Sequence, residues 1–114
     1  MIRIYGVPTC DKIKKTQKLL ENNNIAFTFV NVRKEPISKD KLRTITNLLN
    51  LENVLNRKGL LFRKLGLKDK SLSDSQLFEE LFREQGMIKR PLIEKDGRFW
   101  IGYNEEDILK FLTK

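Results

Sequence analysis

The order of the secondary-structure signals limits the fold of this chain more than any single motif does. Two short runs rich in apolar, β-branched and aromatic residues, at 2–5 and at Ala26–Val32, each predict a strand. Between them, apolar residues recur at roughly helical spacing from about Lys12 to Asn22, opposite a basic face. A strand, a helix and a strand in this order form a βαβ unit, whose two strands are expected to pair in parallel.

Helical signals fill the middle of the chain. Apolar spacing and turn residues predict helical segments at 38–49, 51–55, 60–67 and 73–86. Ser38 and Ser73 are the expected N-caps, and Ser73 opens a candidate capping box with Gln76 at its N3 position. Gly66 and Gly86 are expected to end the helices that precede them.

The chain closes with a hairpin signal and one more helix. Strands are predicted at 91–94 and 98–101 around an Asp96-Gly97 turn, and Asn104 is the expected cap of the last helix. The whole order predicts an α/β fold, in which helices flank a thioredoxin-like mixed β-sheet and an all-helical subdomain is inserted. We expect a single domain, 1–114, with a thioredoxin-like part at 1–33 and 87–114 and the helical insert at 34–86.

The residue content excludes several classes of protein. No apolar run approaches the ~20 residues of a membrane span, and the N-terminus lacks the apolar core of a signal peptide. One cysteine allows no internal disulfide, so a cytoplasmic location is expected. The lack of histidine excludes a Cys–His protease, and it leaves no recognisable zinc or iron–sulfur site. We therefore expect no metal and no bound cofactor.

The net charge of +8, from 23 basic and 15 acidic residues, has two interpretations. It can attract an anionic substrate, nucleic acid or an acidic protein surface, or it can serve solubility alone. The sequence shows no aromatic RNA-binding signature, so direct nucleic-acid binding depends on charge alone.

The single cysteine, Cys10, lies between the first strand and the first helix. At a helix N-terminus the unpaired N–H groups and the helix dipole favour a thiolate, which is a nucleophile at neutral pH. Lys12, Lys14 and Lys15 add positive potential, whereas Asp11 opposes it unless its side chain caps the helix. The alternative is that Cys10 is a small buried apolar residue.

Cys10 has no second cysteine to resolve a mixed disulfide. The residue three positions later is Ile13, so the chain lacks a Cys-x-x-Cys motif. Any redox cycle at Cys10 therefore requires an external thiol, such as glutathione or another protein.

Three segments together resemble the ArsC/Spx/YffB family: YGVPTCDKIKK, VLNRKGLLFRKLGL and IKRPLIEKDGRFWIGYNEEDIL. This family includes glutaredoxin-linked arsenate reductases, Spx-type regulators and YffB-type proteins. The resemblance implies a thioredoxin-like fold with a helical insert and an active-site role for Cys10. It also implies that Pro91 is cis and that Lys14, Arg57 and Arg90 bind an anionic substrate. Arginine suits oxyanions, although Arg57 and Arg90 can equally be surface residues.

Two departures from the family pattern guide the choice within it. Arsenate reductases have a further arginine where this chain has Gly102-Tyr103-Asn104, which argues against arsenate. The GYNEEDI stretch is similar to Spx and YffB proteins, but the Cys-x-x-Cys of Spx is missing, and CDKIKK looks most like YffB.

The resemblance thus implies a cytosolic thiol-dependent oxidoreductase. Its substrate would be a small oxyanion, a disulfide or a mixed disulfide, and its external donor glutathione or glutaredoxin. The alternative is an Spx-like transcriptional regulator that binds the C-terminal domain of the RNA polymerase α-subunit without a redox switch.

Overall fold

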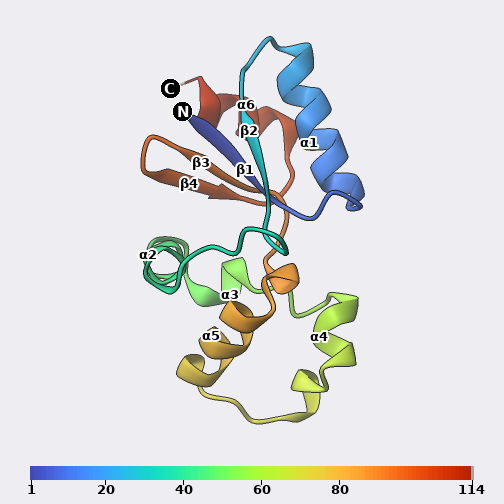
Figure 1. Cartoon of the computed structure of the whole chain (residues 1–114), viewed down its shortest axis with the longest axis vertical. Helices are drawn as coiled ribbons and strands as arrows, with labels where there is room; N and C mark the ends of the chain where they lie inside the picture. The colour runs from blue at the N-terminus through green and yellow to red at the C-terminus, as the bar shows by residue number, and fades with distance from the viewer. Residues whose placement is uncertain (114) are drawn as a thin grey trace.

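The computed structural model describes residues 1–113, and its centre is a four-stranded mixed sheet with the order β2-β1-β3-β4. The strands are β1 (Ile2–Gly6), β2 (Thr28–Asn31), β3 (Leu92–Lys95) and β4 (Arg98–Ile101). The β1 and β2 strands pair in parallel, which confirms the predicted βαβ unit, while β3 is antiparallel to both β1 and β4. The fold is therefore α/β with a thioredoxin-like sheet (Figure 1).

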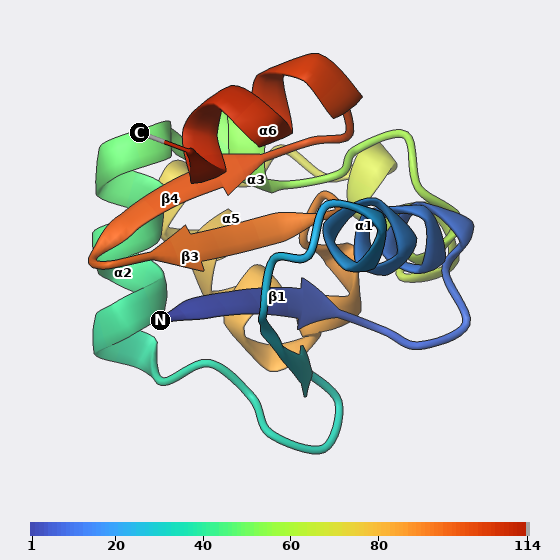
Figure 2. The same cartoon turned by 90° about the horizontal axis from the view of Figure 1, so that it is seen from above.

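Two helices, α1 (Asp11–Asn22) and α6 (Glu105–Leu112), pack on one face of this sheet (Figures 1 and 2). Their buried side chains form one apolar cluster with residues of β1 and β3. Its fully buried members are Ile4, Ile13, Leu20, Ile93 and Ile108. Because strand side chains alternate between faces, the neighbours Tyr5 and Leu92 point to the other side.

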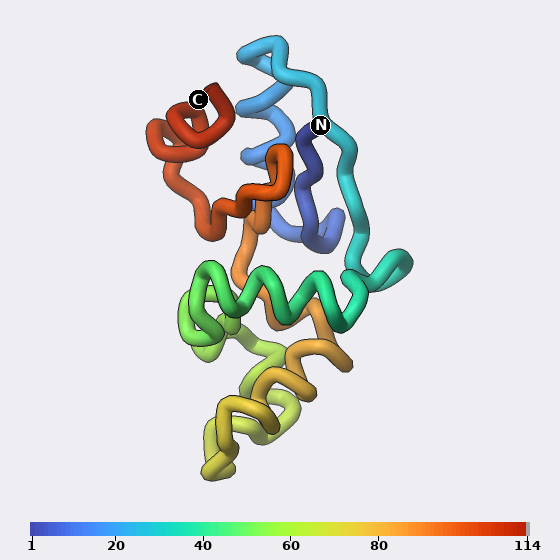
Figure 3. The backbone as a smooth tube through the Cα atoms, turned by 90° about the vertical axis from the view of Figure 1, so that its left-hand side faces the viewer, coloured from blue at the N-terminus to red at the C-terminus, as the bar shows by residue number. Residues whose placement is uncertain are grey.

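The other helices lie between β2 and β3 in the chain: α2 (Lys39–Leu49), α3 (Leu51–Val54), α4 (Leu60–Lys64) and α5 (Asp74–Arg83), with short 3₁₀ turns η1 (Leu67–Asp69) and η2 (Gln85–Met87). Figure 3 shows α2 running across the middle of the molecule, between the sheet and the other helices of this group. Tyr5 and Leu92 share a second apolar cluster with them. The helical group extends the molecule to 44 × 25 × 25 Å.

Local capping explains where several elements begin. The Ser38 Oγ accepts a hydrogen bond from the Lys41 N–H, and Ser73 with Gln76 forms the predicted capping box at α5. The Asn104 Oδ1 accepts a bond from the Asp107 N–H at α6. These N-caps are therefore confirmed.

Turn geometry confirms two more predictions. Asp96 and Gly97 both have positive φ, at 49° and 80°, as a tight hairpin turn requires. Gly66 adopts the left-handed conformation just after α4, with φ 69°.

Several predicted boundaries are wrong, among them the end of the helix predicted at 60–67, which stops at Lys64. The helix α5 ends at Arg83, and Gly86 lies beyond it in η2, where its N–H donates to the Glu84 carboxylate. The Met87 N–H donates to the Glu84 carbonyl and the Ile88 N–H to the Gln85 carbonyl, both at 3.1 Å, which makes this segment a 3₁₀ turn. Gly86 is therefore not the residue that ends α5. The strand β2 begins at Thr28 rather than Ala26. No helix within residues 1–113 is long and apolar enough to cross a membrane.

Gly6, the last residue of β1, lets the first helix approach the sheet closely. A Cβ added there would overlap the side chain of Ile13. Because Ile13 is fully buried, it has no open space into which to move. The absence of a side chain at Gly6 therefore sets the position of the N-terminal end of α1, where Cys10 lies.

Candidate active site

Cys10 is the N-cap residue of α1. Its backbone N–H donates to the Val7 carbonyl at 3.2 Å, and its carbonyl accepts from the Lys14 N–H at 3.1 Å. The Cys10 N–H thus closes the turn before the helix, and the Cys10 carbonyl accepts the first hydrogen bond of the helix. The Cys10 side chain makes no capping bond. The thiol is free and partly buried, and it contacts both apolar clusters.

Cys10 lies beside the positive partial charge of a helix N-terminus. It lies at the positive end of a twelve-residue helix whose first N–H groups have no intrahelical partner. The Asp11 carboxylate does not cap the helix, because it makes no hydrogen bond or ion pair within residues 1–113. Its carboxylate remains as a negative charge beside the cysteine.

An open cavity of about 690 Å³ contains Cys10. Its wall combines the start of α1, the segment after α3, the segment before β3 and the end of β4. The lining residues are Cys10, Asp11, Lys12, Asn56, Lys58, Lys89, Arg90, Gly102 and Tyr103. Four of them are cations and one is an acid. Within residues 1–113, none of these cations is in an ion pair, so the cavity carries positive potential suited to an anion.

Backbone bonds bring the distant wall segments together. The Asn56 N–H donates to the Met87 carbonyl at 2.9 Å, and the Lys89 N–H donates to the Val54 carbonyl at 2.7 Å. These bonds hold the segment after α3 against the segment that leads into β3. Asn56 and Lys58 are thereby placed beside Lys89 and Arg90.

The Arg90–Pro91 peptide bond is cis, as the resemblance implied. The Pro91 carbonyl accepts a 2.9 Å hydrogen bond from the Gly102 N–H, which ties the start of β3 to the end of β4. Arg90 lines the cavity from the segment that leads into β3, and a Cβ added to Gly6 would lie 3.8 Å from the Arg90 Cγ.

Of the three predicted anion-binding cations, the structure brings only Arg90 to Cys10. Lys14 does not line the described cavity. Arg57 lines a neighbouring one with Glu52, which shares Asn56, Lys58 and Lys89 with the Cys10 cavity but does not include Cys10. The Arg57 guanidinium donates two hydrogen bonds to the Glu52 carboxylate, at 2.8 and 2.6 Å, and lies 5.8 Å from the Phe62 ring centre. These bonds raise the pKa of Arg57 and lower that of Glu52.

Lys12 was predicted to add positive potential beside Cys10, and it lines the cavity. The residues that the sequence did not predict for the site are Lys58, Lys89, Asn56 and Tyr103. No local pattern separates Lys58 from its neighbour Arg57; in the structure Glu52 holds Arg57 in an ion pair. Within residues 1–113, no group of three potential ligands among His, Cys, Asp and Glu could hold a metal ion.

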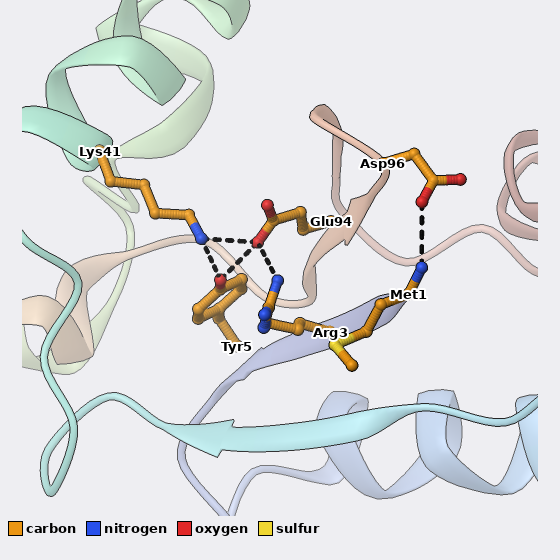
Figure 4. A network of polar contacts seen from close by, with 6 residues as sticks. All are labelled: Met1, Arg3, Tyr5, Lys41, Glu94 and Asp96. Carbon is orange, nitrogen blue, oxygen red and sulfur yellow. Dashed lines mark hydrogen bonds and ion pairs between the residues drawn. The ribbon is translucent and has the colours of Figure 1, made fainter.

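A polar network joins the sheet to α2 away from this cavity (Figure 4). The Tyr5 hydroxyl donates to Glu94 Oε1 at 2.5 Å, and Lys41 Nζ donates to Tyr5 Oη and Glu94 Oε1 at 2.8 and 2.7 Å. Arg3 Nη1 lies 3.5 Å from the same carboxylate oxygen. Because the network includes β1, β3 and α2, it fixes the helical group on the sheet.

Burial and hydrogen bonding act in opposite directions within this network. Burial disfavours the Glu94 carboxylate, but bonds from Lys41 and Tyr5 outweigh it, so the pKa of Glu94 is lowered. Burial likewise opposes the Lys41 ammonium, yet its bonds to Glu94 and Tyr5 raise the pKa of Lys41. Burial, followed by the bond to Glu94, raises the pKa of Tyr5.

Comparison with known proteins gives consistent relatives. The global transcriptional regulator Spx 1 of Oceanobacillus iheyensis is 30% identical over all of this chain and 88% of its own length. The solved YFFB protein superposes with a TM-score of 0.89 at 29% identity, covering 98% of this chain and 99% of that one. An arsenate reductase from Vibrio cholerae gives 0.82 at 29% identity, covering 97% of each chain. The ArsC family model matches residues 5–111. The chain belongs to the ArsC family.

Proposed function

We propose that this protein is a thiol-dependent oxidoreductase in which Cys10 is the nucleophile and an external thiol, glutathione or glutaredoxin, completes the cycle. One observation carries the proposal. Cys10 is the N-cap residue of α1, its side chain makes no capping hydrogen bond, and it lines an open cavity with four cations and one acid. The similarity to an arsenate reductase supports the reaction class.

With a disulfide substrate, the Cys10 thiolate attacks one sulfur. The substrate S–S bond breaks, a new S–S bond to Cys10 forms, and the leaving thiolate takes up a proton from water. An external thiolate then attacks the substrate-derived sulfur of the mixed disulfide, displaces the Cys10 thiolate and forms a disulfide with that half of the substrate. A second external thiol attacks this disulfide, so the substrate leaves as two thiols while two external thiols are oxidised to one disulfide. Arg90 and Lys58 are proposed to stabilise the negative charge of the substrate and leaving group.

Completion by an external thiol follows from the position of Ile13. This residue occupies the place of a second cysteine, and its side chain is fully buried against β1. The chain has no second thiol that could release Cys10 from a mixed disulfide. Small oxyanions such as arsenate form the second substrate class, although Gly102 and Tyr103 supply no cation at their end of the cavity.

An activity panel tests the proposal. Glutathione with glutaredoxin is supplied as the reductant, and arsenate, a glutathionylated protein and a small disulfide are offered to the wild type and to Cys10→Ser. We expect turnover of at least one substrate by the wild type and none by Cys10→Ser, with equal far-UV circular dichroism of the two proteins. No turnover of any substrate by a folded wild type would refute the proposal.

A second candidate is a transcriptional regulator. It is favoured by the 30% identity to the regulator Spx 1, which extends over the whole of this chain. This function predicts binding to the C-terminal domain of the RNA polymerase α-subunit, and binding should persist in Cys10→Ser. A pull-down at moderate salt measures it, and a folded sample that retains no α-domain would exclude this candidate.

A further inference from the structure

Asn56 lies where the cavities around Cys10 meet. It lines the Cys10 cavity and two smaller neighbours of about 210 and 260 Å³, and it is the one residue of 1–113 that all three share. The half-buried Asn56 side chain makes no hydrogen bond with any residue of 1–113. Its amide is therefore available to a molecule that reacts at Cys10.

The backbone of Asn56 is fixed on both sides. Its N–H donates to the Met87 carbonyl at 2.9 Å, and its carbonyl accepts from the Gly59 N–H at 3.2 Å. The preceding residue, Leu55, forms an antiparallel bridge with Ile88. The amide is thus carried by a short side chain on a held backbone, so its placement costs less conformational entropy than that of a long lysine side chain.

Gly59 leaves room for the Asn56 amide. A Cβ added to Gly59 would lie 2.8 Å from Asn56 Nδ2 and 3.2 Å from Asn56 Cγ. The backbone of Gly59 does not itself require glycine, because its φ of −75° and ψ of 154° suit any residue. Close packing of the Asn56 side chain, and not backbone conformation, therefore accounts for the glycine at this position.

We propose that Asn56 is a catalytic residue of the Cys10 reaction, whose side-chain NH₂ group donates a hydrogen bond to the thiolate displaced from a disulfide substrate. Gly59 is the positioning residue that holds this amide. The inference rests on the proposed oxidoreductase function and deepens it, because it assigns the group that receives the leaving sulfur. No covalent step is added. The Cys10 sulfur bonds to one substrate sulfur, the substrate S–S bond breaks, and its electron pair stays on the leaving sulfur until water protonates it.

The direction of attack explains why the donor comes from another part of the chain. Displacement in line places the new negative charge two S–S bond lengths, about 4 Å, from the Cys10 sulfur. Cys10 belongs to the turn before α1, whereas Asn56 belongs to the segment after α3 and lines the same cavity. The cations of the cavity supply a general positive potential, and the amide adds one directed bond to the charge as it develops.

Single-turnover kinetics with two uncharged disulfides test the inference. Bis(2-hydroxyethyl) disulfide releases a thiolate with its charge on sulfur, whereas 2,2′-dipyridyl disulfide releases one whose charge spreads into the ring. Intact mass follows the mixed disulfide that forms on reduced Cys10. Loss of the donor in Asn56→Ala is expected to lower the rate with the aliphatic disulfide about tenfold. The rates with the aromatic disulfide and with iodoacetamide, which releases no thiolate, should fall by less than about twofold.

Asn53→Ala is the matched control. The Asn53 amide donates to the Leu49 carbonyl at 2.7 Å, and Asn53 does not line any of the three cavities. This variant should keep all three rates within about twofold of the wild type. If Asn53→Ala and Asn56→Ala slow the aliphatic disulfide equally, or if Asn56→Ala slows iodoacetamide as much as that disulfide, the role of the amide as donor is overturned.

Asn56→Asp separates the hydrogen bond from the shape of the side chain. It keeps the size of the side chain but replaces the NH₂ donor with a negative oxygen. We expect it to slow the aliphatic disulfide at least as much as Asn56→Ala does. A rate close to that of the wild type would show that shape alone suffices, and it would overturn the proposal.

A double-mutant cycle tests the role of Gly59. Gly59→Ala should slow the aliphatic disulfide about fivefold, because the new methyl displaces the Asn56 amide. In the Asn56→Ala background the same change should leave the rate unaltered. The other close neighbour of the added methyl, the Asn56 carbonyl oxygen at 3.3 Å, is present in both backgrounds. Equal effects in the two backgrounds would show that Gly59 acts through the backbone and would overturn its positioning role.

The same measurements separate this inference from the function on which it rests. Failure of the folded wild type to form a mixed disulfide with either reagent would overturn the proposed function. A wild type that reacts, with Asn56→Ala reacting equally fast, would overturn the role of Asn56 alone. Far-UV circular dichroism of each variant establishes that the fold is retained.

Discussion

Cys10 and Arg90, from opposite ends of the chain, line the same cavity, one at the start of α1 and the other just before the cis proline of β3. The Arg90 guanidinium makes no ion pair within residues 1–113, so its charge is available to a substrate anion. We expect Arg90→Gln to lower kcat/KM for a disulfide or oxyanion substrate by about tenfold. Arg83→Gln, on the distant helix α5, is the control, and equal losses in the two variants would contradict a specific role for Arg90.

Lys58 and Arg57 are neighbours in sequence with different surroundings. Lys58 lines the Cys10 cavity, whereas Arg57 is held by Glu52 outside it. We expect Lys58→Gln to lower kcat/KM about threefold to tenfold and Arg57→Gln to change it by less than about twofold. Of these two cations, only Lys58 lines the cavity with Cys10, and the charge of Arg57 is balanced by Glu52. Steady-state kinetics at low ionic strength measure both. A larger loss in Arg57→Gln than in Lys58→Gln would contradict this placement.

The sequence predicted the features that depend on near neighbours. A cap such as Ser73 with Gln76 requires only a few consecutive residues, so its pattern is visible in the sequence. The same is true of the Asp96-Gly97 turn and of Cys10 at the start of a helix. Arg90 was placed by resemblance to the family, not by any local pattern.

The choice between Arg57 and Lys58 could not be made locally. It depends on the direction of the backbone after α3, which is set by bonds to Met87 and Lys89 far along the chain. The division of the domain into 1–33 with 87–114 and an insert at 34–86 stays a prediction. Tyr5 of the sheet shares one apolar cluster with residues of the helical group, so the core does not follow those boundaries.

The Tyr5–Lys41–Glu94 network should make stability depend on pH at both ends of the range. The pKa of Glu94 is lowered from 4.5, so its contribution is present above about pH 4.5 and is lost as the pH falls through the folded-state pKa. The pKa values of Tyr5 and Lys41 are raised from 10.0 and 10.5. Their contributions are present below those values and are lost as the pH rises through the folded-state pKa values.

We expect Glu94→Gln to lower the free energy of unfolding by about 1–2 kcal/mol at pH 7, because charge-assisted bonds become neutral ones. The difference from wild type should shrink as the pH falls below 4.5, where the wild-type carboxyl is protonated in the unfolded chain. Urea unfolding between pH 3 and pH 7 measures it, with Glu79→Gln, from an exposed ion pair, as the control. A difference that stays constant over this range would contradict the network's role.

The close approach of α1 to β1 predicts a coupled pair of core substitutions. Gly6→Ala adds a Cβ that overlaps Ile13, so it should destabilise the fold by about 1–3 kcal/mol. Ile13→Val alone should cost about 0.5–1.5 kcal/mol. It removes Cδ1, the nearer of the two Ile13 atoms that the new methyl would overlap, and so relieves part of the overlap. The double variant should therefore be more stable than the sum of the single changes predicts. Urea unfolding of all four proteins measures this coupling, and simple additivity would show that Gly6 does not set the position of the helix that carries Cys10.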